Sequence, residues 1–238
     1  MLARRGRWRF PSAPSWLRGN GTAEGFIRAF RAAGVMPEMV QVGNEITNGF
    51  LWPDCRLPDH WDRFANLVAA GIQGVDAGRG DAPRPKIMIQ IDEGGNQETT
   101  QWFFDNLKSR GVEFDVIGQS YYPWWQGSLE ELRRNLQFMS KTYKKDIVVV
   151  ETAYDWRTGE IFASKRKPFP ETAEGQRDFL QALAKVAFET PSSRCIGLIW
   201  WEPMAAGDIA KRALFDDHHN ALQSIDVFDP TQSSTRRK

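Results

Sequence analysis

Segments with helical periodicity alternate with short apolar runs along most of the chain. Residues 23–34, for example, place Phe26, Ile27, Phe30 and Ala33 on one face of a helix. Apolar runs of strand length, rich in Val and Ile, come between the periodic segments. The pattern predicts helices over 23–34, 61–78, 98–111, 128–143 and 172–190, and strands over 39–45, 85–92, 114–122, 146–154 and 195–203.

The apolar runs lack the strict alternation of polar and apolar positions that is typical of a half-exposed strand. Strands of this kind are buried on both faces, as in a parallel sheet wrapped by helices. Polar residues gather where these strands end, and the loops of a (β/α)8 barrel converge at that end. A doubly wound sheet also binds ligands there, but its glycine-rich phosphate fingerprint is missing. The pattern therefore favours the barrel.

The strand count does not reach that of a closed barrel, which needs eight strands. Residues 1–38 contain one helix and a lead rich in Trp, Pro and Arg. We therefore expect an α/β fold of the (β/α)8 TIM-barrel type that is incomplete, either lacking the first three strands or forming an open sheet. Strands 4 to 8 of the barrel are expected to be present. We expect a disordered basic lead over 1–13, a partial catalytic domain over 14–229 and a disordered tail over 230–238.

The amino-acid composition bears on which kinds of binding partner can be expected. The 31 basic and 30 acidic residues leave a net charge of +1, which gives no reason to expect nucleic acid or a charged membrane surface. No run approaches the roughly 20 apolar residues of a membrane span. The opening MLARRGRWRF lacks the apolar core of a signal peptide. Two cysteines and three histidines without zinc-site spacing predict neither a disulfide framework nor a metal site.

Ten tryptophans are many for this length, and several stand in loop-like contexts. Trp52, Trp124, Trp125 and Trp201 lie beside proline or polar residues near strand ends. Core packing explains most tryptophans in most proteins. Clusters at strand ends instead suggest flat apolar platforms, which suit the faces of sugar rings.

Two glutamates stand at the ends of apolar runs. VQVGNE ends on Asn44 and Glu45, and DIVVVETAY carries Glu151. In a barrel, both strand tips face one mouth. Retaining glycosidases need two carboxyl groups about 5–5.5 Å apart, one protonated to assist the leaving oxygen and one ionised to attack the anomeric carbon. We therefore predict a catalytic pair, and the alternative is two unrelated surface glutamates.

Four stretches, in this order, carry a resemblance to a known family: VQVGNEITNGFLWP, DVIGQSYYPWWQGSLEEL, VVVETAY and GLIWWEP. They resemble the family 53 glycoside hydrolases, the arabinogalactan endo-β-1,4-galactanases, from about Pro14 to about Asp229. The resemblance implies a (β/α)8 barrel that cleaves β-1,4-galactan with retention. It implies a polysaccharide or oligosaccharide substrate and no cofactor, with calcium at most a structural ion. Family members are usually exported, but this chain shows no signal-peptide pattern, so its localisation is left open.

The resemblance also implies roles for single residues. Glu45 is similar to the family's acid/base and Glu151 to its nucleophile, while Asn44 resembles a clamp on the sugar 2-hydroxyl. One of Tyr121 and Tyr122 is expected to point inward and donate its hydroxyl to Glu151, and we favour Tyr121. Weaker candidates for substrate contacts are Trp201 as the floor of the site, Trp52, Trp124 and Trp125 as sugar platforms, and Asp92 on the rim.

Two positions depart from the family pattern. Gln90 stands where family members commonly have a histidine, and Ala205 where they have a tryptophan. Both positions border the expected cleft, so they weaken the assignment of the sugar but not of the paired glutamates. Two alternatives remain: a truncated barrel that is weakly active or inactive and at most binds carbohydrate, and a clan relative that acts on another β-glycan.

Overall fold

The structure is a computed structural model and describes residues 22–159 and 164–229, so the predicted lead over 1–13 and tail over 230–238 lie outside it. Its parallel strands form one sheet in chain order. These are β1 (Met39–Gln41), β2 (Lys86–Ile91), β3 (Val116–Ser120), β4 (Asp146–Glu151) and β5 (Cys195–Leu198). The α-helices are α1 (Ala23–Ala32), α2 (Trp61–Arg79), α3 (Gln97–Ser109), α4 (Leu129–Tyr143) and α5 (Ala173–Phe188).

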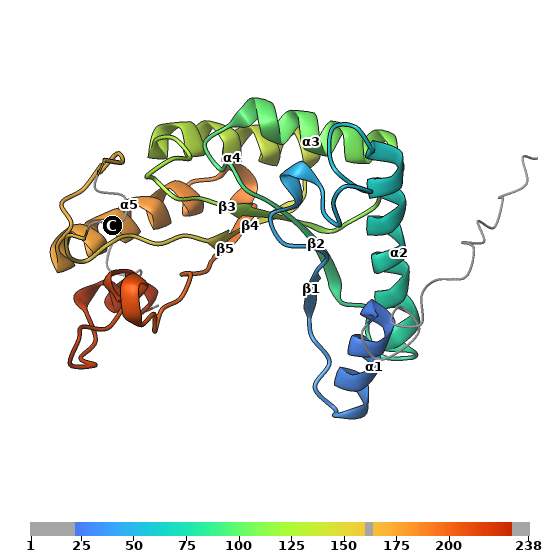
Figure 1. Cartoon of the computed structure of the whole chain (residues 1–238), viewed down its shortest axis with the longest axis horizontal. Helices are drawn as coiled ribbons and strands as arrows, with labels where there is room; N and C mark the ends of the chain where they lie inside the picture. Colours follow the sequence, from blue (N-terminus) through green and yellow to red (C-terminus); the bar gives the residue numbers. More distant parts are fainter. Residues whose placement is uncertain (1–21, 160–163, 230–238) are drawn as a thin grey trace, which may run out of the picture.

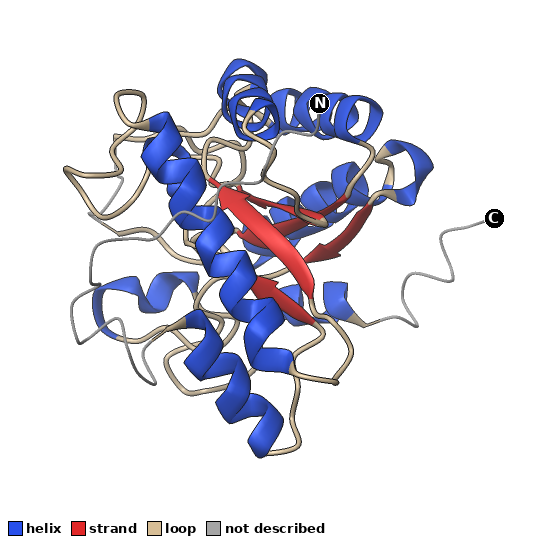
Figure 2. Cartoon of the chain, turned by 90° about the vertical axis from the view of Figure 1, so that its right-hand side faces the viewer, coloured by secondary structure: helices blue, strands red, loops and turns tan. Residues whose placement is uncertain are grey.

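Helices cover the outer face of the curved sheet (Figure 1). A helix follows each strand from β1 to β4, and the view from the side shows the strands flanked by these helices (Figure 2). The strands are apolar on both faces, and such a sheet needs helices packed against it to shield it from water. The alternation of strands and helices along the chain provides this cover. The arrangement is part of a (β/α)8 barrel, as the sequence predicted.

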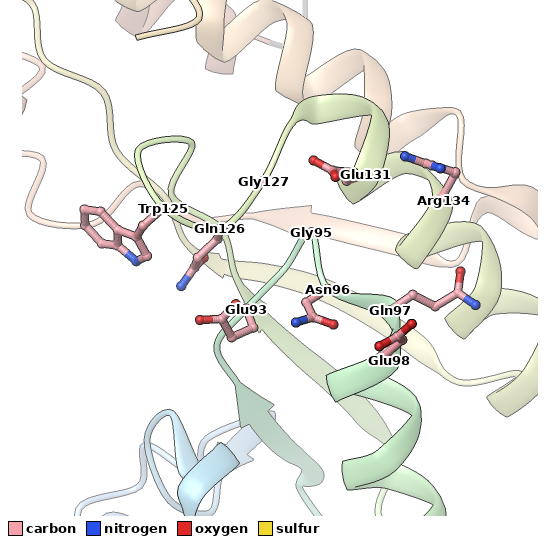
Figure 3. A pocket seen from close by; sticks show the side chains of 10 residues that line it. All are labelled: Glu93, Gly95, Asn96, Gln97, Glu98, Trp125, Gln126, Gly127, Glu131 and Arg134. Carbon is pink, nitrogen blue, oxygen red and sulfur yellow. The ribbon is translucent and has the colours of Figure 1, made fainter. Parts of the chain in front are cut away.

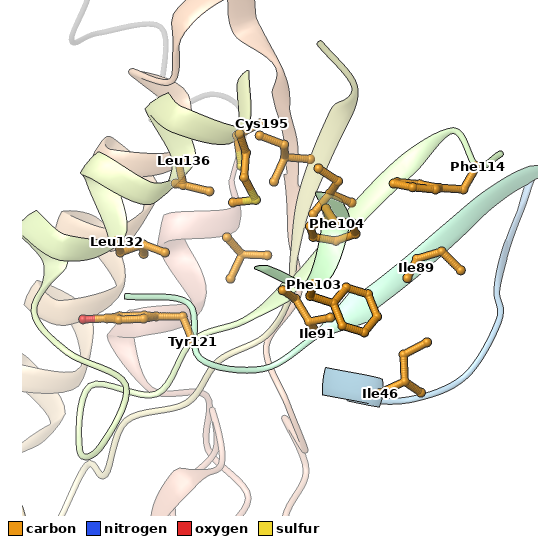
Figure 4. Packing of buried hydrophobic residues seen from close by; sticks show 14 of the residues in the cluster. Ile46, Ile89, Ile91, Phe103, Phe104, Phe114, Tyr121, Leu132, Leu136 and Cys195 are labelled. Atoms are coloured by element: carbon orange, nitrogen blue, oxygen red, sulfur yellow. The ribbon is translucent and has the colours of Figure 1, made fainter. Parts of the chain in front are cut away.

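Side chains of β2 show how the sheet divides the apolar residues. Ile89 and Ile91 point toward the helices and pack in the main core with Phe103 and Phe104 of α3 (Figure 4). The next positions along the strand face the opposite side, where the barrel interior would be. A smaller, separate cluster lies there, formed by Met88, Val116, Val148 and Val150.

Every predicted helix and strand is present, and the differences lie at the ends. β1 stops at Gln41 and β5 at Leu198, each four or more residues before the predicted end. The chain beyond them forms loops at the carboxyl end of the sheet. Helix α4 begins with the capping box that its sequence predicts, in which Ser128 and Glu131 each bind the other's backbone N–H.

The apolar face predicted for α1 is only partly buried. Ile27 is buried, whereas Phe26 and Phe30 are exposed. The reason is the close approach of α1 to α2, where a Cβ atom on Gly78 would lie 2.6 Å from the Glu24 carbonyl oxygen and 2.8 Å from the Ile27 Cβ. The helices thus meet along the narrow strip of α1 that contains Ile27, and the phenylalanines face away.

Within the described ranges, β1 and β5 each pair with a single neighbour and are the edges of the sheet. Sheet edges expose backbone N–H and C=O groups that can pair with other strands. No helix in this part of the chain is long and apolar enough to cross a membrane.

Candidate active site

The loops that follow the strands meet at one end of the sheet because all its strands are parallel. Backbone hydrogen bonds fasten these loops together. The Tyr121 N–H donates to the Glu151 carbonyl (2.8 Å), and the Trp201 N–H donates to the Thr152 carbonyl (2.8 Å). The end of the sheet is therefore a fixed surface from which side chains can be aimed.

Glu151 ends β4 and receives two side-chain hydrogen bonds. The Tyr122 hydroxyl donates to its Oε2 atom (3.0 Å), and the Gln90 Nε2 atom donates to its Oε1 atom (3.1 Å). Burial and the neighbouring Glu151 charge raise the pKa of Tyr122, so the phenol stays protonated and remains a donor. Both oxygens of the carboxylate are thus held in a defined orientation.

The tyrosine that binds Glu151 is not the one we favoured from the sequence. Tyr121 is fully buried in the main core, and its hydroxyl donates to the Gly127 carbonyl (3.1 Å). Tyr122 falls two positions after Ser120, which faces the inner side and accepts a hydrogen bond from Gln90. Because side chains two positions apart share a face of a strand, Tyr122 lies on the same inner side as Ser120.

Glu45 lies in the turn after β1, where it precedes the short helix Ile46–Asn48 and has a left-handed backbone conformation with φ 47°. Its side chain is half-buried. Burial raises the pKa of Glu45, and the charges of Glu151 and Asp92 raise it further. A hydrogen bond with the Ser120 side chain opposes this shift. The charges of the Glu45 and Glu151 carboxylates therefore interact.

Gln90 hydrogen-bonds to both Glu45 and Glu151. Its fully buried side chain donates to Ser120 Oγ (2.8 Å) and to Glu151 Oε1 (3.1 Å). Its Oε1 atom accepts from the Glu45 N–H (3.4 Å) and from Gln41 Nε2. The Gln90 side chain thus connects the Glu45 backbone N–H to the Glu151 carboxylate. In the sequence, Gln90 stands out only as a departure from the family pattern, although its place in the middle of a predicted central strand indicates that it is buried.

Asn44 and Asp92 border the two glutamates. Asn44 is exposed, and its Oδ1 atom accepts from Gln41 Nε2 (3.3 Å). Asp92 accepts from the Thr47 hydroxyl, and its own N–H donates to the same Thr47 oxygen (3.1 Å). Asp92 thereby holds the turn that contains Glu45 against the end of β2, and its contact with substrate stays a prediction.

The tryptophans predicted as sugar platforms differ in how far their side chains are exposed to solvent. Trp124 is only 3% exposed and stacks on Tyr154 with ring centroids 5.6 Å apart, so little of its surface is open to a sugar, and its role as a platform stays a prediction. Trp125 is 42% exposed and stacks on Tyr122 at 5.3 Å. Trp201 is half-buried and meets Tyr122 edge to face at 6.5 Å.

Trp52 is also exposed, in the loop that the Gly49–Arg56 bridge closes. The Arg56 guanidinium lies over its ring at 4.6 Å and occupies one of its faces. The other face of Trp52 is the one that could contact a ligand. Its role as a platform stays a prediction.

Metal ligands do not cluster in the described part of the chain, where no group of three or more His, Cys, Asp or Glu side chains is placed to hold an ion. The two cysteines, Cys55 and Cys195, are buried free thiols. The site is thus built from carboxylates, amides, hydroxyls and aromatic rings.

The parallel sheet with its alternating helices and the polar residues at its carboxyl end place this chain in the class of (β/α)8 barrels. Sequence comparison is more specific. The profile of glycosyl hydrolase family 53 matches residues 22–228, and the chain belongs to this family.

Curated relatives agree with the family. An uncharacterised protein of Niallia circulans is 38% identical over 226 residues, which are 88% of this chain and 60% of that protein. The arabinogalactan endo-β-1,4-galactanase of Humicola insolens is 33% identical over 231 residues, which are 90% of this chain and 68% of that protein. The chain thus spans about 60 to 68% of the length of these relatives.

Solved structures show the same fold. A fungal β-1,4-galactanase superposes with a TM-score of 0.76 at 30% identity, over 87% of this chain and 66% of that chain. The family 53 catalytic domain of Ignisphaera aggregans gives a TM-score of 0.74 at 29% identity, over 87% and 64% of the two chains. Xylanase 10B of Thermotoga petrophila, at 12% identity and a TM-score of 0.58, covers 90% of this chain and 64% of that chain and shares the fold alone.

Proposed function

We propose that this chain is a retaining, endo-acting glycoside hydrolase that cleaves β-1,4-galactan by double displacement. The observation that carries the proposal is that the Gln90 side chain hydrogen-bonds both to the Glu45 backbone N–H and to the Glu151 carboxylate. Such a link brings two carboxyl groups with different surroundings to one site. The galactanase names of several family relatives support the choice of sugar.

The surroundings of the two glutamates suit different roles. Glu45 has a raised pKa and can hold the proton that the leaving sugar oxygen needs. Glu151 receives two hydrogen bonds, which suit a carboxylate that attacks while ionised. We therefore assign Glu45 as the acid/base and Glu151 as the nucleophile.

The reaction then proceeds in two steps. Glu151 attacks the anomeric carbon, the bond to the leaving oxygen breaks, and Glu45 gives that oxygen its proton, so that a glycosyl-enzyme forms. In the second step, Glu45 takes a proton from water, and the oxygen of that water displaces Glu151 from the anomeric carbon. Two inversions return the original configuration.

Neighbouring residues support these steps in the proposal. The Tyr122 hydroxyl orients Glu151 and releases it as the covalent bond forms. Asn44 lies on the Glu45 side, where its amide can bind the sugar 2-hydroxyl in the transition state. Trp201 offers its half-buried ring beneath the reacting sugar, beside Tyr122.

The second candidate function is that of an incomplete barrel that binds β-glycan without hydrolysing it. It is favoured by the two edge strands of the described sheet. In that case the paired glutamates would bind sugar, but the sugar would not be held in the geometry that attack requires.

An assay of the purified chain on β-1,4-galactan separates the two. We expect new reducing ends within the polymer, with the β-anomer appearing first in proton NMR. Glu151→Gln and Glu45→Gln are each expected to lower kcat by a factor of about 10³ or more. Binding of galactan without any cleavage would establish the second candidate. If either the Glu45→Gln or the Glu151→Gln variant kept a kcat close to that of the parent, the assignment of Glu45 as acid/base and Glu151 as nucleophile would be rejected.

A further inference from the structure

A buried arginine lies against the aromatic residues that surround the proposed nucleophile. Arg212 ends the short helix Gly207–Arg212 and is only 6% exposed. Its guanidinium lies over the Trp124 ring at 5.0 Å and over the Trp201 ring at 5.8 Å, distances at which a cation is attracted to an aromatic face. Burying a charge is costly unless it is paired, so a cation at this place needs a partner.

The fully buried Asp155 carboxylate provides the opposite charge. It lies 3.6 Å from Arg212 Nε and 3.0 Å from Lys211 Nζ. Backbone groups fix the same helix, because the Trp156 N–H donates to the Lys211 carbonyl (2.8 Å) and the Trp200 indole N–H donates to the Arg212 carbonyl (2.8 Å). The guanidinium is thus held in one place before any substrate binds.

Two tryptophans connect Arg212 to the tyrosine that binds the proposed nucleophile. Tyr122 stacks on Trp124 with ring centroids 6.2 Å apart and meets Trp201 edge to face at 6.5 Å. Its hydroxyl donates to Glu151 Oε2 (3.0 Å). Arg212 therefore lies over two of the rings that hold Tyr122 in position.

The third tryptophan beside Tyr122 has different surroundings. Trp125 stacks on Tyr122 at 5.3 Å, but it is 42% exposed and lies at one side of a cleft of about 440 Å³ (Figure 3). Trp124, in contrast, is buried and is backed by the Arg212 guanidinium. The buried support of Tyr122 therefore comes from the side of Arg212.

The charge of Arg212 also acts on Tyr122. Burial and the Glu151 charge raise the pKa of Tyr122, and the Arg212 charge opposes this shift. A nearby cation stabilises negative charge on the phenol oxygen, which strengthens the O–H group as a donor to Glu151. Contact and charge thus have the same effect on the hydrogen bond between Tyr122 and Glu151.

We propose that Arg212 is a positioning residue: through the two tryptophans it holds Tyr122 in the place from which the hydroxyl donates to Glu151. The inference rests on the proposed function for the role of Glu151 as the nucleophile. Misplacing a reacting group lowers the rate of attack more than the affinity for substrate. Loss of Arg212 is therefore expected to appear in kcat.

The test is a double-mutant cycle between Arg212 and Tyr122, with β-1,4-galactan as substrate. Arg212→Met removes the guanidinium but leaves Asp155 paired with Lys211. We expect it to lower kcat by about tenfold with little change in KM. In the Tyr122→Phe background, which lacks the hydroxyl, the same exchange is expected to lower kcat by less than about twofold, because residues that act through one another are not additive. Equal losses in the two backgrounds would overturn the proposal.

Two further variants separate positioning from general stability. Arg212→Lys keeps a positive charge beside Asp155 and is expected to recover part of kcat; if Arg212→Met does not fold, the cycle is run with Arg212→Lys, and a loss is again expected only when the Tyr122 hydroxyl is present. Arg133→Met removes a guanidinium that pairs with Glu189 (2.6 Å) between α4 and the end of α5. A loss of kcat in Arg133→Met as large as in Arg212→Met would overturn the proposal.

A second measurement tests the inference without turnover. The chain has four tyrosines, so labelling tyrosine with ¹³C at Cζ gives a spectrum of four signals, and the Tyr122 signal is the one that Tyr122→Phe removes. Glu151→Gln is expected to move this signal, because the acceptor of the hydroxyl changes. In the Arg212→Met background the same exchange is expected to move it less.

The outcomes separate this inference from the proposed function. If the parent does not cleave galactan and Arg212 still governs the response of the Tyr122 signal, the function is overturned and the positioning of Tyr122 is supported. If the parent cleaves galactan, but the cycle is additive and the Tyr122 signal responds equally with and without Arg212, the inference is overturned and the function stands. A parent without cleavage, together with a Tyr122 signal that Arg212 does not affect, overturns both.

Discussion

The Gln90 side chain hydrogen-bonds to both proposed catalytic residues, to the backbone N–H of Glu45 and to the carboxylate of Glu151. It is fully buried, and an uncharged amide at this place donates to Glu151 while accepting from the Glu45 backbone. Histidine, which the family resemblance leads one to expect here, can change its charge near neutral pH. This chain therefore uses a linker whose hydrogen bonds do not depend on a protonation state.

Replacing Gln90 tests its role as a positioning residue. We expect Gln90→Leu to lower kcat by about 10²-fold with a smaller change in KM, because Glu151 loses a donor and the Glu45 turn loses an acceptor. Gln90→His is expected to recover part of kcat and to add a pH dependence that the parent lacks. Steady-state kinetics from pH 4 to 8 make the measurement. Gln101→Leu, on the exposed side of α3, is the matched control.

Asp92 is expected to affect the pH dependence of activity through its charge. The pKa of Glu45 is raised by burial, and further by Glu151 and Asp92, so an acid/base at Glu45 stays protonated to a pH above the ordinary glutamate value of 4.5. Activity is then lost as pH rises through this raised pKa. Asp92→Asn removes one of the raising charges and keeps an oxygen for Thr47.

The alkaline limb of kcat/KM is therefore expected to move to lower pH in Asp92→Asn, with the maximum rate little changed. A full pH profile of parent and variant on galactan measures the shift. An alkaline limb that stays in place, or moves to higher pH, would show that Glu45 does not set it.

Single residues also show where inference from the sequence failed. Glu45 and Glu151 are predicted as a catalytic pair because each ends an apolar run, whereas Gln90, which contacts both residues in the structure, lies inside one and is not predicted as a site residue. The choice between Tyr121 and Tyr122 depended on which face of β3 is the inner one, and Ser120 defines that face only once its partner is known. Burial of Trp124 depends on Tyr154, far away in the sequence.

At the scale of elements, a buried ion cluster joins the loop after β4 to the short helix Gly207–Arg212. The Asp155 carboxylate is fully buried and lies 3.0 Å from Lys211 Nζ and 3.6 Å from Arg212 Nε. The Arg212 guanidinium in turn lies over the Trp201 ring at 5.8 Å. The cluster thus helps to hold the proposed floor of the site.

Removal of Asp155 is expected to destabilise this junction. Asp155→Ala leaves two buried cations without their counter-ion, which typically costs about 3–5 kcal/mol of unfolding free energy. Urea denaturation of parent and variant provides the measurement. Asp54→Ala breaks an ion pair with Arg63 that is exposed on both sides, and is expected to cost less than about 1 kcal/mol. Equal losses for the two variants would contradict a structural role for the buried cluster.

The elements themselves were the part of the fold that the sequence predicted best. Helical periodicity and apolar runs report on burial within one segment, so the ten segments could be found without knowledge of their neighbours. Their ends could not, because β1 ends where Gly43 and Glu45 take positive φ angles. The exposed side of α1 was also missed, since Gly78 of α2 decides which side of α1 is buried.

At the scale of the whole molecule, the sheet order follows the order of the chain, and the glutamates stand on β4 and just after β1. The sequence predicted the parallel sheet and the incomplete barrel from the strand number and type. It could not predict the hydrogen-bonded link between the glutamates, which depends on the relative register of β2, β3 and β4.

The position of β1 at the edge of the sheet affects which part of the molecule opens first on warming. It is a three-residue strand with one partner among the residues that the structure describes, whereas β4 is held on both sides. Local opening begins where few contacts must be broken, so warming is expected to free the turn that carries Glu45 while Glu151 is still in place. Under the proposed roles, a partly opened molecule would keep the nucleophile but lose the proton donor, and activity is expected to fall at a lower temperature than that of unfolding.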